Sequence, residues 1–235
     1  MIHKDGTFNS LQADTSLPRQ LPILQEHVPP YIRQQLLVRV YSLLSLQLIA
    51  TGALCTLRSS PTMQDPQVMI LGAFVAVPCL LLITCVRPAF PCNLICLFLF
   101  TLGMGIVVAH ATIKVSFVVM MEALGLTAAV FVSLTALVMC TGSDFTWLQS
   151  WLFVGLVTLV GFSVFQCFVY SPWLHVLLSW VGTMVFSGFV LYDTSLLVQR
   201  FGPDEAIDAC LMLYLDVLNL FLSILGVLQS SSTNS

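Results

Sequence analysis

Two long apolar runs joined by a short polar turn decide the fold of this chain. They are Trp173–Val198 (WLHVLLSWVGTMVFSGFVLYDTSLLV) and Ala206–Leu228 (AIDACLMLYLDVLNLFLSILGVL), with QRFGPDE between them. Each run is near the ~20 residues that an α-helix needs to cross hydrocarbon. Each also carries one carboxylate within the apolar stretch, Asp193 in the first run and Asp216 in the second. We therefore expect a helical hairpin with an acid inside each arm.

The two acids lie at similar depths along this hairpin. Asp193 lies 10 residues before Pro203 and Asp216 lies 13 residues after it. At 1.5 Å per residue they are ~15 and ~20 Å from the turn. An ionised carboxylate in a bilayer costs roughly 2.5–3.5 kcal/mol or more, so such residues face protein or water and are usually functional.

Two carboxylates that meet in a low dielectric share a proton, because both cannot ionise cheaply. The pair would bind a cation transiently when both acids are charged, and would act as a proton-controlled latch otherwise. We predict that Asp193 and Asp216 form a pH-sensing or gating pair and a transient Ca²⁺ site. The alternative is two buried acids that are satisfied separately by Tyr192 or Tyr214.

The composition identifies an integral membrane protein. Hydrophobic residues make up 58% of the chain and charged residues only 8%, against about 25% charged in soluble domains. The net charge of −3 comes without a basic cluster, which argues against a nucleic-acid partner. Most of the eight cysteines lie in or beside apolar runs, where cysteine behaves as a small hydrophobe. We expect no disulfide framework, no bound cofactor and no enzymatic activity.

Five further apolar runs precede the hairpin, at about Leu36–Leu57, Gln67–Val86, Phe90–Ala111, Val115–Cys140 and Trp147–Tyr170. This pattern predicts an all-α integral membrane protein, a bundle of seven transmembrane helices over residues 36–228, with the last helix central or re-entrant. Residues 1–35 are polar and proline-rich, and we expect a disordered cytosolic tail there. Residues 229–235 form a short polar tail.

The basic residues favour a cytosolic N-terminus. That orientation places six of the eight on the cytosolic side, namely Lys4, Arg19, Arg33, Arg39, Arg87 and Arg200. Arg58 and Lys114 then fall on the other side. The side of the C-terminus depends on whether the last run crosses the membrane.

Other polar residues in the runs have two interpretations each. Asp208 and Asn219 share one helix face with Asp216, and we interpret them as supporting polar residues. Glu122 either attracts ions to an outer vestibule or reaches into the headgroups. Arg87 either closes a cytosolic gate by pairing with an acid or anchors the second run at the interface.

Several motifs together resemble the Bax-inhibitor-one family, also called the transmembrane Bax inhibitor motif family, and in particular its Lifeguard and Golgi anti-apoptotic branch. In chain order they are Arg39-Val-Tyr-Ser-Leu-Leu-Ser-Leu-Gln47, Pro91-Cys-Asn93, Glu122-Ala-Leu-Gly-Leu-Thr127, Asp144-Phe-Thr146, Phe189-Val-Leu-Tyr-Asp-Thr194, Gly202-Pro-Asp-Glu205 and Leu213-Tyr-Leu-Asp-Val-Leu-Asn-Leu-Phe-Leu222. They cover the chain from about residue 33 to 228.

The resemblance implies six helices around a central seventh, and a pH-sensitive calcium leak channel of Golgi, endoplasmic reticulum or related membranes that inhibits apoptosis. It implies that Asp193 and Asp216 form the proton-sensing latch, with Arg87 as the nearest match to an arginine that contacts the first acid. Implied partners are the lipid bilayer, calcium ions, apoptosis regulators and intracellular calcium-release channels. One departure is Met104, which stands near the place of an acid in related third spans.

Two other functions remain open from the sequence. The first is a membrane interaction protein that restrains death-pathway partners and transports nothing. The second is an intramembrane aspartyl protease, although no Gly-x-Gly-Asp surrounds Asp216 and no Pro-Ala-Leu motif follows it.

Overall fold

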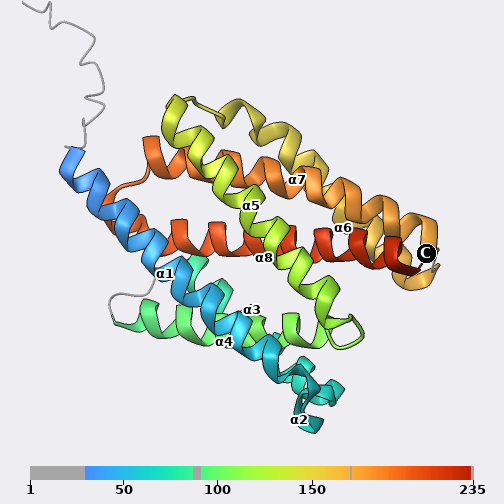
Figure 1. Ribbon diagram of the computed structural model, residues 1–235. Helices are drawn as coiled ribbons and strands as arrows, with labels where there is room; N and C mark the ends of the chain where they lie inside the picture. Colours follow the sequence, from blue (N-terminus) through green and yellow to red (C-terminus); the bar gives the residue numbers. More distant parts are fainter. Residues whose placement is uncertain (1–29, 87–90, 170, 234–235) are drawn as a thin grey trace, which may run out of the picture.

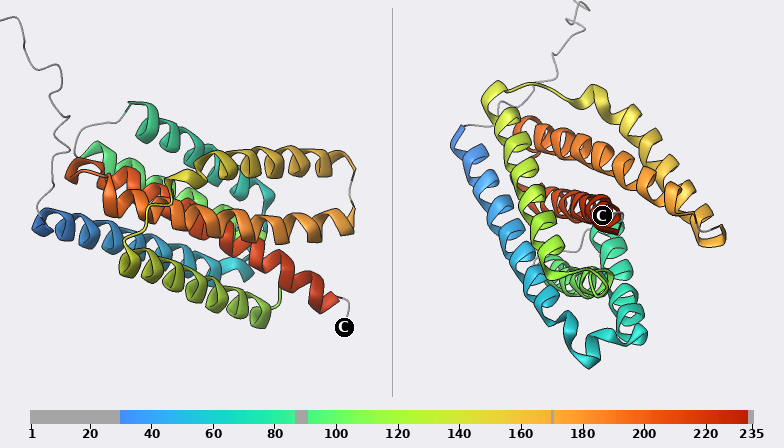
Figure 2. Two further views of the ribbon diagram at one scale, coloured as in Figure 1. Left: turned by 90° about the horizontal axis from the view of Figure 1, so that it is seen from above. Right: turned by 45° about the vertical axis from the view of Figure 1, so that its right-hand side comes forward.

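The last helix of the chain forms the centre of the molecule. The computed structural model describes residues 30–86, 91–169 and 171–233. The right-hand view in Figure 2 looks nearly along α8 (Ala206–Thr233), with the other helices arranged around it. In the most apolar 18-residue stretch of α8, 61% of the residues are buried inside the protein. The corresponding stretches of the other six candidate membrane spans are 39% buried or less. A mostly apolar helix is suited to this buried position.

The surrounding helices follow one another in the order shown in Figure 1. Their bounds are α1 Pro30–Thr56, α2 Pro61–Gln64, α3 Pro66–Leu81, α4 Cys92–Ala111, α5 Phe117–Thr141, α6 Gln149–Phe168 and α7 Pro172–Gln199. Short helical turns lie at Leu57–Ser59 (η1), Leu82–Val86 (η2), Thr146–Leu148 (η3) and Pro203–Glu205 (η4). Helix α8 packs against α1, α4, α5 and α7, whereas α3 packs mainly on α4 and α6 mainly on α7.

Seven helices of the described chain are long and apolar enough to cross a membrane. The prediction of an all-helical membrane protein with a central last helix is therefore confirmed. Helix α8 has 28 residues, which at 1.5 Å per residue make ~42 Å, more than the ~30 Å of bilayer hydrocarbon. Helix α8 is therefore long enough to cross the bilayer. Helix α1 begins and α8 ends at opposite ends of the bundle (Figure 1).

The first and last helices extend beyond the predicted bounds of 36 and 228. Helix α1 begins at Pro30, six residues before the predicted start of the helical bundle. Proline at a first helical position is favourable, because its missing N–H has no helical partner there. Helix α8 continues to Thr233, because nothing at Gln229–Ser231 interrupts the backbone hydrogen bonds. The remainder of the N-terminal tail lies outside the described residues.

Polar side chains start and end several helices. The Ser60, Asp65 and Ser116 side chains accept hydrogen bonds from backbone N–H groups at the starts of α2, α3 and α5. Helix α5 ends at Gly142, whose φ of 62° is left-handed, a conformation that glycine adopts without a Cβ clash. These signals position the connections between spans.

The outer helices present large apolar side chains outward. Phe74 on α3 is 75% exposed, Trp151 on α6 is 73% exposed and Phe168 on α6 is 82% exposed. Such an apolar surface would cause aggregation in water, and it is suited to contact with lipid hydrocarbon.

Candidate functional site

The structure brings the two intramembrane acids together where α7 and α8 pack as a hairpin. Asp193 on α7 and Asp216 on α8 are each only 7% exposed. Their carboxyl groups are close enough to interact with each other. A hydrogen bond between two carboxyl groups requires that one of them carry the proton. The hairpin therefore holds a buried pair that is suited to one shared proton.

The pair is not fully satisfied by its surroundings. Among the described residues, Oδ2 of Asp216 is buried without a hydrogen-bond partner. Burying an acceptor without a partner costs free energy, because its hydrogen bonds to water are lost and not replaced. Oδ2 of Asp216 can therefore still accept a hydrogen bond.

Tyr214 was one of two residues proposed to satisfy the acids separately, and the structure shows it bonded elsewhere. Its hydroxyl shares a hydrogen bond of 2.7 Å with the hydroxyl of Thr51 on α1. Its ring meets Phe100 of α4 edge-on, with 5.9 Å between the centroids. Tyr214 thus attaches α8 to α1 and α4, and does not hold Asp216.

A second set of polar contacts extends this attachment. The side-chain amide of Gln47 on α1 donates to the hydroxyl of Thr101 on α4 at 2.8 Å. The thiol of Cys210 on α8 donates to the amide oxygen of Gln47 at 2.9 Å. We did not predict these contacts. The signal was Gln47 and Thr51, two polar residues one helical turn apart in an apolar run.

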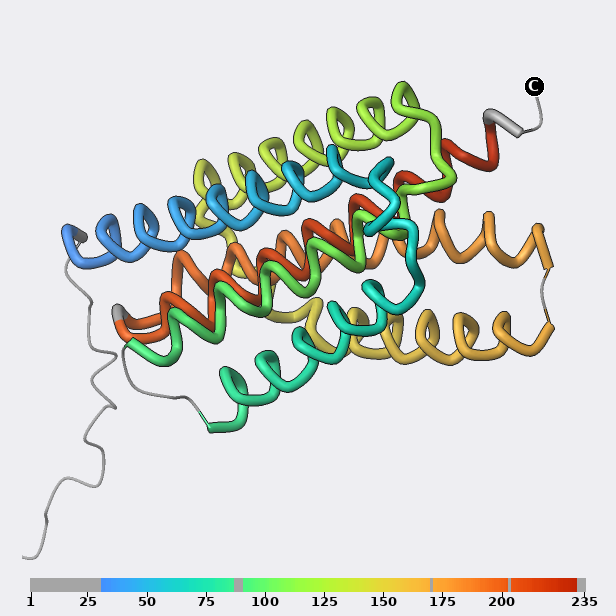
Figure 3. Tube along the Cα trace, turned by 90° about the horizontal axis from the view of Figure 1, so that it is seen from below, coloured from blue at the N-terminus to red at the C-terminus, as the bar shows by residue number. Residues whose placement is uncertain are grey.

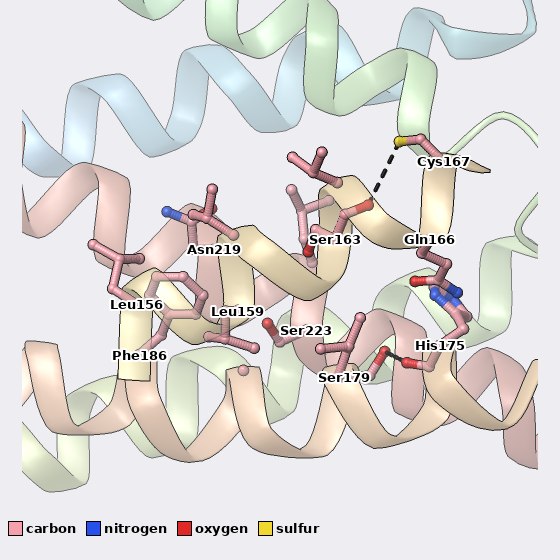
Figure 4. A pocket seen from close by; sticks show the side chains of 15 residues that line it. Leu156, Leu159, Ser163, Gln166, Cys167, His175, Ser179, Phe186, Asn219 and Ser223 are labelled. Carbon is pink, nitrogen blue, oxygen red and sulfur yellow. Dashed lines mark hydrogen bonds between the residues drawn. The ribbon is translucent and has the colours of Figure 1, made fainter. Parts of the chain in front are cut away.

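A cleft of about 600 Å³ lies between α6, α7 and α8. Figure 4 shows its polar side chains, with His175 and Gln166 at one end and Asn219 near Phe186 at the other. Ser179 and Ser223 lie between them. The end with His175 is close to the connection between α6 and α7. The cleft is therefore a partly polar recess in an otherwise apolar half of the bundle.

The cleft approaches the acid pair through Asn219. This residue lies three positions after Asp216 on α8, ~4.5 Å further along the helix axis. Residues three apart in a helix share a face. The inner end of the cleft is thus about one helical turn from Asp216.

Comparison with known proteins identifies the family of this chain. Residues 33–233 match the family described as inhibitor of apoptosis-promoting Bax1. The chain belongs to this Bax inhibitor family. It is similar to Bax inhibitor 1 of Schizosaccharomyces pombe, with 36% identity over 86% of this chain and 80% of that protein.

This Bax inhibitor family member is also similar to proteins of the Lifeguard and Golgi anti-apoptotic branch, which its motifs resemble. Protein lifeguard 4 of Mus musculus is 33% identical over 85% of this chain and 87% of its own length. The Golgi anti-apoptotic protein of Vaccinia virus (strain Lister) is 33% identical over 86% of this chain and 88% of its own length. The resemblance drawn from the motifs is confirmed.

The remaining predicted site residues of this Bax inhibitor family member are not gathered at the pair. Glu122 is exposed on α5 and does not line the cleft. Asp208 lies eight positions before Asp216, ~12 Å along α8, and interacts with another group. Arg87 lies outside the described residues.

Proposed function

We propose that this Bax inhibitor family member is a calcium leak channel of intracellular membranes, gated by protonation of the pair formed by Asp193 and Asp216. By lowering the calcium content of the stores it would inhibit apoptosis. One observation carries the proposal: Asp193 on α7 and Asp216 on α8 are both almost fully buried and are close enough to interact. Intramembrane acids commonly mark ion pathways.

Protonation acts on the pair through charge. With one shared proton, the two carboxyl groups attract each other and hold α7 against α8. When that proton leaves, two negative charges repel each other in a low dielectric and attract a cation. The proposal therefore predicts more calcium flux at pH 8 than at pH 6.

The pair suits a permeating ion better than a resident one. Ca²⁺ prefers six to eight oxygen ligands, and two carboxylates supply at most four. Among the described residues, no group of three or more Asp, Glu, His or Cys side chains is placed to hold a metal. Conduction requires binding that is weak enough for the ion to leave.

The cleft supports an access route from the end of the bundle opposite the start of α1. Its wall leads from His175 past Ser179 and Ser223 to Asn219, one helical turn from Asp216. Oxygen atoms along this wall offer a hydrated cation partial ligands. The N-terminus would be cytosolic, so the cleft would open toward the lumen.

The first experiment measures calcium flux into liposomes that hold the purified protein, at pH 6 and pH 8. We expect Asp216→Asn, and the double change Asp193→Asn with Asp216→Asn, to abolish the pH dependence. The control is Asp204→Asn, which removes an exposed acid from the turn of the same hairpin. Wild-type flux no greater than that of empty liposomes at both pH values would exclude the channel.

The second candidate is an interaction protein that restrains death-pathway partners without transport. It is supported by the Vaccinia relative, whose name describes an anti-apoptotic protein of the Golgi. The two proposals can be distinguished by measuring calcium flux and cell survival in cells that express the double aspartate variant. Lost flux with undiminished survival after an apoptotic stimulus would favour the interaction protein.

A further inference from the structure

An apolar groove runs between α1 and α5, apart from the cleft between α6, α7 and α8. Helix α8 forms its floor through Val217, Leu218 and Phe221. Gly52 lines it from α1, and Ala128 lines it from α5. The two walls lie on the same side of the bundle (Figure 3). The groove encloses about 190 Å³ and its lining is almost entirely apolar.

The groove has the length of one leaflet of hydrocarbon. On α5 its lining extends from Met120 to Val132, which is ~18 Å at 1.5 Å per residue. Half of a hydrocarbon core of ~30 Å is ~15 Å. Leu124 and Val132 are 50% and 63% exposed, so the groove opens toward the lipid. An acyl chain therefore fits it in length and chemistry.

A cation stands at one end of the groove. A guanidinium nitrogen of Arg58 contacts the sulfur of Met120, which lines the groove. The same guanidinium lies 6.0 Å from the ring centroid of Phe117, a cation–π distance. Among the described residues Arg58 has no carboxylate partner. Met120 and Phe117 therefore hold the half-buried guanidinium of Arg58 in place at the end of the bundle opposite the start of α1. No described carboxylate neutralises its charge there.

We propose that this groove binds one anionic phospholipid, with an acyl chain between α1 and α5 and the phosphate on Arg58. Arginine matches phosphate with paired N–H donors, and hydrocarbon excludes competing water from the groove. The site lies in the leaflet opposite the N-terminus. It does not depend on the proposed channel activity.

The test is native mass spectrometry of the full chain, released from nanodiscs that contain equal amounts of phosphatidylglycerol and phosphatidylcholine with identical acyl chains. We expect wild type to retain one phosphatidylglycerol in preference to phosphatidylcholine. Arg58→Gln lowers this preference by about fivefold, the effect typical of one basic residue at an anionic surface. Lys114→Gln removes a charge that makes neither of the contacts of Arg58 with Met120 and Phe117, and leaves the preference unchanged.

A second pair of variants tests the groove itself. A Cβ at Gly52 meets no atom within 4 Å, so Gly52→Leu fills the groove without a backbone clash and lowers lipid retention at least tenfold. Gly125→Leu is the matched control, because Gly125 has the same open surroundings but does not line the groove. Helix content by circular dichroism verifies that both variants fold.

Three outcomes overturn the proposal. The first is unchanged retention in Gly52→Leu. The second is an equal loss of preference in Lys114→Gln and Arg58→Gln, which indicates general surface charge and not a site. The third is equal retention of both lipids by wild type, which indicates an acyl-chain groove without headgroup recognition.

Discussion

At the scale of single residues, the buried polar groups of α8 divide between two of its faces. Asp216 faces Asp193 on α7, whereas Cys210 and Tyr214 bond to α1. Under the proposed gating, the contact between Asp216 and Asp193 changes with protonation. The face of α8 that bonds to α1, called the fixed face below, would then hold α8 in place while α7 moves.

The fixed face can be measured with a double-mutant cycle on Thr51 and Tyr214. Thr51→Val leaves the hydroxyl of Tyr214 buried without its partner at 2.7 Å. Interhelical hydrogen bonds in membranes contribute about 0.6 kcal/mol on average and up to about 1.7 kcal/mol. We expect Thr51→Val and Tyr214→Phe each to lower the unfolding free energy by about 1 kcal/mol in detergent. The double variant should lose less unfolding free energy than the two single variants lose in total. A loss equal to that total would show that the two hydroxyls are energetically independent.

At the scale of elements, α3 is held to α4 by close backbone approach. A Cβ built on Gly103 would lie 2.6 Å from the backbone oxygen of Gly72 and 3.0 Å from Cβ of Ala76. Small residues at a membrane interface permit this approach, which improves van der Waals packing. The contact needs glycine because a backbone atom cannot move aside as a side chain does.

We expect Gly103→Ala to lower the unfolding free energy by about 1–3 kcal/mol, the usual cost of overpacking. Gly161→Ala is the control, since a Cβ there meets nothing within 4 Å. Thermal unfolding of both variants in detergent measures the difference. Equal thermal unfolding midpoints for the two variants would mean that α3 and α4 can move apart enough to accept the added Cβ without a loss of unfolding free energy.

A polar clasp joins the connection between α5 and α6 to the end of α7. The side-chain amide of Gln199 donates to the backbone oxygen of Ser143 at 2.9 Å. Arg200 reaches Asp144 at 3.4 Å, and Asp144 accepts a hydrogen bond from the N–H of Thr146 at 2.8 Å. The hydrogen bonds from Thr146, and secondarily the charge of Arg200, lower the pKa of Asp144.

A lowered pKa in the folded state fixes the sign of the pH effect. The contribution of Asp144 to stability is complete above its unfolded pKa of about 3.9. It is lost as pH falls through the lower pKa of the folded protein. We expect the thermal midpoint of Asp144→Asn to lie below that of wild type at pH 7 and to converge with it in acid. Midpoints that stay apart by the same amount at pH 3 would contradict the linkage.

At the scale of the whole molecule, the seven described helices that are able to cross a membrane would place the two ends of the chain on opposite sides of it. The distribution of basic residues favours a cytosolic N-terminus, and α8 is long enough to cross. We therefore expect a glycosylation sequon appended after Ser235 to be modified in endoplasmic reticulum membranes. The same tag before Met1 should stay unmodified. If neither tag is modified, the last helix does not cross, and if only the N-terminal tag is modified, the orientation is reversed.

The sequence by itself determined the class of the protein and the depth of its acids. Apolar runs of about 20 residues predict membrane helices, because hydrocarbon requires every backbone hydrogen bond to be made within the segment. The fixed rise of a helix then placed Asp193 and Asp216 at similar distances from their shared turn. Their meeting could be anticipated because both arms belong to one short hairpin.

Only the tertiary structure decided which faces of the helices meet. In hydrocarbon, side chains that contact lipid and side chains that contact protein are equally apolar, so periodicity does not separate them. The bond between Gln47 and Cys210 joins residues 163 positions apart. The cleft beside Asn219 and the groove below Arg58 likewise depend on how helices distant in sequence pack, and this information is absent from any single run.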